Sequence, residues 1–151
     1  GGGATAMKFA AKKPRDGYTL MTITPTHLAT IAQGKAGIKI DDLVGLARGT
    51  DDPQLLMAKK GTFKDIKDLL AQGKTRKIKV GGTFVGGIDH ITAFTFAKKA
   101  NMQMNYIPYK GGGNIVTSLI GGDIEIGVLN LSEADSQIKA GEISPLIVLA
   151  A

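Results

Sequence analysis

The stretch VGGTFVGGIDHI, residues 80–91, decides the fold class of this chain. Two Gly-Gly pairs and a threonine follow a short apolar run typical of a strand, and a run typical of a helix comes next. Such a loop can bind an anion, because glycine lets the backbone approach a ligand and the free N–H groups of a helix start attract negative charge. The alternative interpretation of one such loop is a tight turn that packs the strand closely against the helix.

A second glycine loop, YKGGGN at residues 109–114, also follows a strand-like run and precedes a helix-like one. Residues 23–27 and the opening triglycine also precede helix-like runs. Ligands of open α/β sheets bind at the carboxyl ends of strands, so several such loops would converge on one site. The sequence therefore predicts an anion site, with glycines that serve only as turns as the alternative.

Composition excludes several classes of site. The chain has 151 residues, of which 43% are hydrophobic, enough for one or two modest cores. Its apolar runs are all shorter than the roughly 18 residues that a membrane-spanning helix needs. The absence of cysteine excludes disulfides, thiolate nucleophiles and cysteine-ligated metals. Nucleotide-binding glycine motifs are not evident either, so we expect no cofactor and no metal.

The net charge of +6 raises the question of nucleic acid, but the lysines are scattered. Only KTRKIK, residues 74–79, is a dense basic patch, and it lacks the interleaved aromatic residues that would stack on bases. We therefore expect no nucleic-acid partner. A mild positive excess would instead attract small anions.

Strand-like and helix-like runs alternate along the chain, which predicts an α/β protein with a mostly parallel sheet. The strands are expected at residues 18–23, 55–58, 78–81, 105–109, 124–129 and 145–150. The helices are expected at residues 4–12, 63–72, 89–100, 114–120 and 132–140, with one more opening at residues 24–26. The beginning, GGGATAMKF, and the strand-like end at residues 144–151 predict a chain truncated at both ends.

Several stretches in a fixed order resemble the substrate-binding receptors of tripartite tricarboxylate transporters, the Bug family. They are GGGATA with PRDGYTLMTITPTHL, then GGTFVGGIDHI, NYIPYKGGGNIVTSLIGGDIEIGV and SEADSQIKAGEISPLIVLA. Together they cover nearly the whole chain. The two Gly-Gly pairs, Asp89-His90 and the triglycine are similar to the tricarboxylate branch of that family.

The resemblance implies a periplasmic-binding-protein type II-like clamshell (a Venus flytrap) of two α/β lobes, about twice as long as this chain. It places residues 1–54 in lobe 1, residues 55–144 in lobe 2, and residues 145–151 in a strand that returns to lobe 1. It also implies a periplasmic location, a monomer, and integral-membrane transporter subunits as partners.

The resemblance also implies which residues line the cleft. Thr24 and Thr26 would do so from lobe 1, and Gly82, Thr83, Gly86 and Gly87 would offer backbone N–H groups and one hydroxyl from lobe 2. The triglycine would form a facing carboxylate nest, with two residues at the rim: Gly111, Gly112, Gly113, Asn130 and Ser132. Asn114 departs from the pattern, since an acidic residue often follows the three glycines.

Asp89 has two interpretations. It could bind a hydroxyl or ammonium group of the ligand, or it could simply cap the start of its helix. His90 is more simply a packed histidine than a ligand-binding one. Without a serine or cysteine in a nucleophile elbow, the Asp-His pair alone does not predict a hydrolase.

The sequence therefore predicts a receptor, not an enzyme, that closes two lobes around a citrate-like tricarboxylate or a dicarboxylate. One alternative is a small α/β enzyme that acts on an anionic substrate, with Asp89 and His90 in acid-base roles. Another is a sensory module that uses the same clamshell.

Overall fold

The computed structural model describes residues 2–149, which contacts divide into two compact units. Unit 1 consists of Gly1–Thr50 together with Gly86–Ile88, and unit 2 of Asp51–Val85 together with Asp89–Ala151. The predicted boundary at residues 54 and 55 lies close to the point where the chain passes from unit 1 into unit 2. The assignment of these units to lobes of a longer receptor stays a prediction.

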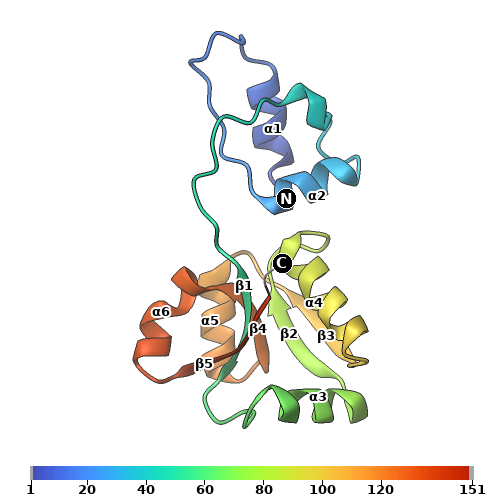
Figure 1. Cartoon of the computed structure of the whole chain (residues 1–151), viewed down its shortest axis with the longest axis vertical. Coiled ribbons are helices and arrows are strands. Elements are labelled where there is room, and N and C mark those ends of the chain that lie inside the picture. The colour runs from blue at the N-terminus through green and yellow to red at the C-terminus, as the bar shows by residue number, and fades with distance from the viewer. Residues whose placement is uncertain (1, 150–151) are drawn as a thin grey trace. The chain divides into compact units, whose positions relative to one another are not determined.

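Unit 2 is built on one five-stranded sheet with the strand order β3-β2-β4-β1-β5 (Figure 1). The strands are β1 (Gln54–Lys59), β2 (Ile78–Gly82), β3 (Met104–Pro108), β4 (Ile126–Asn130) and β5 (Ile143–Leu149). The helices are α3 (Ile66–Thr75), α4 (Ile88–Lys99), α5 (Gly112–Gly121) and α6 (Leu131–Lys139). Each of these elements overlaps a predicted one, with ends that differ by up to three residues.

Helices cover both faces of the sheet, so its central strands are apolar on both sides. In β1, Leu55 and Met57 pack in the cluster under α5 and α6, whereas Leu56 and Ala58 pack in the cluster under α3 and α4. Figure 1 shows α5 and α6 on one side of the strands and α4 on the other. The alternation of strand side chains thus gives unit 2 two cores, one on each face.

The sheet is mixed, and the expectation of a mostly parallel sheet is wrong. Strand β2 is parallel to β3 and to β4, but β1 is antiparallel to both β4 and β5. A buried strand has the same apolar pattern in either direction, so periodicity cannot reveal the direction. Strand β5 pairs with β1 inside unit 2, and the expected return of residues 145–151 to lobe 1 stays a prediction.

Unit 1 contains the helices α1 (Ala4–Ala11) and α2 (Pro25–Ala32) and a short 3₁₀ turn, η1 (Ile40–Asp42). Helix α2 begins as its sequence predicts, with Thr24 as N-cap and proline in the first turn. Its interior is small: Met7, Thr30 and Ala36 are its buried side chains among those described.

The strand predicted at residues 18–23 does not form. These residues lie outside regular structure, and the side chains of Tyr18 and Leu20 are 93% and 72% exposed. A strand needs a neighbour to pair its N–H and C=O groups, and the described part of unit 1 contains no strand. The apolar pattern of the segment is therefore not sufficient to make it a strand here.

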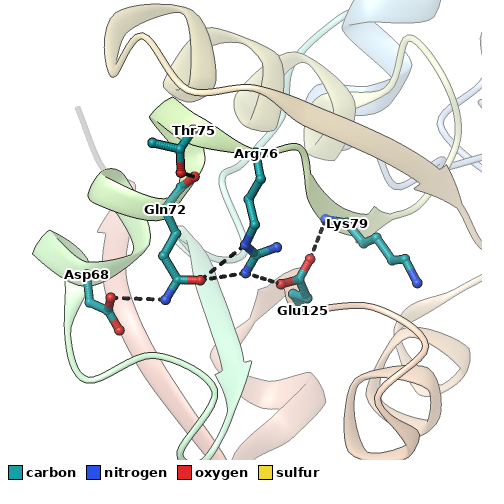
Figure 2. A network of polar contacts seen from close by, with 6 residues as sticks. All are labelled: Asp68, Gln72, Thr75, Arg76, Lys79 and Glu125. Atoms are coloured by element: carbon teal, nitrogen blue, oxygen red, sulfur yellow. Dashed lines mark hydrogen bonds and ion pairs between the residues drawn. The ribbon is translucent and has the colours of Figure 1, made fainter.

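A polar network fastens α3 to the edge of the sheet where β2 starts (Figure 2). The Arg76 guanidinium donates to Gln72 Oε1 and pairs with Glu125 Oε1 at 2.6 Å, and the Gln72 amide donates to Asp68. Glu125 Oε2 also accepts from the backbone N–H of Lys79 at 3.0 Å. Burial raises the pKa of the Glu125 carboxyl, but these hydrogen bonds and the Arg76 charge outweigh burial and hold the pKa below its ordinary value.

Candidate functional site

The candidate site of unit 2 lies at the carboxyl edge of its three parallel strands. Strands β3, β2 and β4 are neighbours in the sheet and run in one direction, so their carboxyl ends share an edge. Helices α4, α5 and α6 each begin shortly after one of these strand ends. Three helix starts, with their positive dipole ends, therefore gather at one edge, which is an arrangement that suits an anion.

Asp89 holds the loop between β2 and α4 in place. One of its carboxylate oxygens accepts from the Thr83 backbone N–H at 2.8 Å and from the Thr83 hydroxyl, and the other accepts from the Gln54 side-chain amide. The Asp89 side chain is buried, where a carboxylate requires such donors. Asp89 thus binds the loop and β1 instead of capping its own helix, and both donors expected from Thr83 are used within the protein.

Tyr106 on β3 secures the same loop. Its hydroxyl donates to the Thr83 carbonyl at 2.6 Å, close to Gly82, where any Cβ would overlap the hydroxyl. Burial raises the pKa of the Tyr106 hydroxyl and the nearby Asp89 carboxylate raises it further, so the hydroxyl stays protonated and remains a donor. The glycine at position 82 therefore has a packing reason, the close approach of strand and loop.

His90 does not pair with its neighbour Asp89. Its ring lies edge-on to Tyr106, with ring centroids 4.7 Å apart, and is stacked with Phe94 at 6.2 Å. The histidine is therefore a packed side chain, as the simpler interpretation of the sequence expects. An acid-base pair between residues 89 and 90 is absent from the described contacts.

The triglycine begins α5. Gly111 is the N-cap, with an extended backbone (φ 178°), and the first backbone bond of the helix runs from Asn114 N–H to its carbonyl. The N–H groups of Gly112 and Gly113 come before that bond, at the open start of the helix. A Cβ on Gly111 or Gly113 would meet no atom within 4 Å, whereas one on Gly112 would overlap the Glu133 carboxylate.

Asn130 and Ser132 lie at the start of α6. The side-chain amide of Asn130 donates to the backbone carbonyls of Asp52 and Pro53 at 2.9 and 3.2 Å. Its backbone N–H donates to the Glu133 carboxylate at 3.0 Å. Asn130 therefore fastens the segment that enters β1, while the side chain of Ser132 is exposed in the first turn of the helix.

The other predicted site residues, Thr24, Thr26, Gly86 and Gly87, belong to unit 1. The Thr24 hydroxyl lies 2.8 Å from Nδ1 of His27 and takes part in capping α2. The Thr26 hydroxyl accepts from the Ile88 N–H at 3.1 Å within the same unit. Gly86 has φ +85°, a conformation that favours glycine.

Residues 2–149 contain no group of three or more histidine, cysteine or acidic side chains that could hold a metal ion. No helix in that range is long and apolar enough to cross a membrane.

Comparison with known proteins shows the family. Residues 1–151 match the family described as "TctC: Tripartite tricarboxylate transporter family receptor". This chain belongs to the TctC family. Protein BugT of Bordetella pertussis is 29% identical over 157 aligned residues, which cover 98% of this chain and 48% of BugT.

Solved structures of similar fold agree with the TctC assignment. "R. palustris Rpa4515 with adipate" has a TM-score of 0.76 and 25% identity, over 99% of this chain and 52% of that one. A structure described as a periplasmic transporter has a TM-score of 0.81 and 25% identity, over 97% of this chain and 51% of that one. The chain thus spans about half the length of the relatives it matches.

Three residues that stabilise this edge of the sheet were not predicted from the sequence: Gln54, Tyr106 and Glu133. The sequence holds only weak signals for them. A lone amide precedes the apolar run of β1, and a glutamate stands three residues after Asn130, the spacing of a capping box. Their roles depend on partners that are distant in the sequence, which a local pattern does not identify.

Proposed function

We propose that this chain carries part of the ligand site of an extracytoplasmic receptor that captures an organic dicarboxylate or tricarboxylate for a tripartite transporter. The observation that carries the proposal is the gathering of three helix starts at the carboxyl edge of β3, β2 and β4. TctC membership and the adipate in the Rpa4515 structure support a carboxylate as the anion. Integral-membrane subunits as partners and a periplasmic location are part of the same proposal, and TctC membership supports them.

The open triglycine is the proposed carboxylate nest. Its N–H groups are the donors, while the Thr83 donors are engaged by Asp89 and serve to shape the neighbouring loop. Asn130 and Ser132 form the rim at α6. Thr24 and Thr26 are the proposed contribution of lobe 1, and Gly86 and Gly87 are, with the rest of the loop between β2 and α4, part of the proposed contribution of lobe 2.

A receptor fits this edge better than an enzyme. Asp89 and His90, the pair that acid-base chemistry would use, have separate partners, and the Asp89 oxygens are occupied by Thr83 and Gln54. Donors that solvate an anion without reacting with it are what a receptor needs. We therefore propose reversible binding without turnover.

Calorimetric titration of the protein that the gene encodes, with citrate, malate, adipate and acetate, tests the proposal. We expect a one-to-one response to at least one di- or tricarboxylate and no product after prolonged incubation. The double variant G111A/G113A should weaken binding at least about tenfold, because its methyl groups flank the nest without touching the protein.

The matched control for the nest is Gly121→Ala, at the other end of the same helix. A Cβ there would meet only Asp123 at 3.7 Å, an ordinary contact. This variant should bind as the unmodified protein does. No response to any carboxylate from a folded protein, or unchanged affinity in the double variant, would contradict the assignment.

A further inference from the structure

Two parts of the proposed site hold residues 51–54, the linking segment by which the chain first enters unit 2. The first stretch of unit 1 ends at Thr50, and Gln54 is the first residue of β1. The Asn130 amide donates to the carbonyls of Asp52 and Pro53, and the Gln54 amide donates to Asp89. The linking segment is therefore bound by side-chain hydrogen bonds to Asn130, where β4 passes directly into α6, and to Asp89 in the first turn of α4.

The Gln54 side chain is unusual in its strand. It is 8% exposed and is followed by four buried apolar residues, so its amide is desolvated together with the Asp89 carboxylate. A buried carboxylate oxygen that loses its donor is costly. The amide therefore has one evident task, which is to hold the Asp89 carboxylate.

Asp89 also restrains the loop between β2 and α4. Its other oxygen accepts both donors of Thr83, and the Thr83 carbonyl is fixed in turn by Tyr106. A continuous series of hydrogen bonds thus runs from Gln54 in the linking segment through Asp89 to Thr83, the first residue of the β2–α4 loop. Neighbouring donors and acceptors in such a buried network act together.

We propose that Gln54 is a positioning residue of the carboxylate site: acting through Asp89 on Thr83, it ties the β2–α4 loop to the segment that links the two units. Ligand affinity therefore depends on Gln54, although its buried side chain does not touch the ligand. Movement of the linking segment and ligand binding are coupled by the same tie, in either direction. This inference rests on the proposed function.

Three variants of the protein that the gene encodes test the positioning role of Gln54. They are Gln54→Ala, Gln54→Glu and the control Gln103→Ala. Gln103 is an exposed glutamine beside the start of β2, and its side chain donates to the carbonyl of Lys74. Adipate and citrate are titrated separately at about pH 8 and about pH 5.5. Each dissociation constant is divided by that of the unmodified protein at the same pH, so that the protonation of the ligand itself cancels.

We expect Gln54→Ala to weaken binding about tenfold, the effect of losing one hydrogen bond to a charged group, while Gln103→Ala has no effect. Gln54→Glu has nearly the same shape as the original residue, so it serves even where the alanine variant fails to fold. At the higher pH its carboxylate repels Asp89 and binding weakens. At the lower pH the introduced carboxyl group takes up a proton and donates to Asp89 in place of the amide, so the ratio returns towards one.

The outcomes separate the two proposals. If the unmodified protein and Gln103→Ala bind neither acid, the proposed function fails, and this inference fails with it. If they bind while both Gln54 variants keep full affinity at both pH values, only the positioning role is overturned. Equal weakening of Gln54→Glu at both pH values also overturns it, because a role limited to packing would give no pH-dependent ratio.

Discussion

The glycines of unit 2 differ in what surrounds them, and this decides what each one can do. A Cβ at position 82 would overlap the Tyr106 hydroxyl, and one at position 81 would overlap Ile124. Gly111 and Gly113 have open space around them. The first pair allows the strand, loop and helix to approach one another closely, whereas the second pair leaves room for a ligand.

The first prediction compares Gly82→Ala with Gly111→Ala. The added methyl at position 82 displaces Tyr106 from Thr83, so we expect the free energy of unfolding to fall by about 1–3 kcal/mol. Gly111→Ala, which has extended backbone and free space, should change it by less than about 0.5 kcal/mol. Urea unfolding followed by circular dichroism measures both. Equal effects of the two variants would show that the Tyr106–Thr83 contact adds no stability.

Sequence patterns were most informative for elements and least informative for side-chain partners. The glycine loop of residues 80–91 was found from its sequence, because strand, loop and helix patterns are local. Asp89 was expected to cap its helix or to meet a ligand; its carboxylate accepts hydrogen bonds from Thr83 and Gln54, and a contact with the ligand stays a prediction. Gln54 lies 35 residues away along the chain, and no local pattern connects the two.

Among the elements, helix α3 shows how the sheet is closed at the edge opposite to the proposed site. Arg76, the residue that directly follows the helix, pairs with Glu125, which precedes β4 and also accepts from the backbone N–H of Lys79 at the start of β2. The ion pair is partly exposed, with 44% and 21% of the two side chains accessible. Its contribution to stability is therefore modest, at about 1 kcal/mol or less.

The second prediction concerns the pH dependence of this ion pair. The pKa of Glu125 is lowered from 4.5 in the folded state, so its stabilisation is present above pH 4.5 and is lost as the pH falls through the lower folded value. Glu125→Gln should therefore be less stable than the unmodified protein at about pH 7, and the difference should shrink towards about pH 3. Urea unfolding across this range measures it. The exposed Glu142→Gln is the control, and a difference that stays constant with pH would contradict the expectation.

The strand expected at residues 18–23 does not form because a strand, unlike a helix, needs a neighbouring strand to pair its backbone groups. Helices satisfy their backbone groups internally, so α1 and α2 form from local signals such as Thr24 and Pro25. A strand depends on a partner, and the described residues of unit 1 supply none. The same dependence hides the direction of β1 and β5 from the sequence, since direction is a property of pairs.

On the scale of the whole molecule, the two units differ in how much they bury. Unit 2 has a two-sided core around strands that are paired on both edges, namely β1, β2 and β4. The described part of unit 1 buries Met7, Thr30 and Ala36 and leaves large apolar side chains exposed, among them Tyr18, Leu20, Val44 and Leu46. We therefore expect the two units to differ in local stability.

The third prediction is that amide hydrogen exchange of the printed 151-residue chain separates three classes of backbone. Amides of β1, β2 and β4 should exchange most slowly, because these strands are paired on both sides and buried on both faces. Those of the edge strands β3 and β5 should be intermediate. Amides of residues 15–23 and 44–50, which lie outside the helices and strands, should exchange fastest. Slow exchange at residues 18–23, comparable with that of β4, would show instead that this segment pairs as the strand its sequence predicts, and that unit 1 closes around a partner for it in solution.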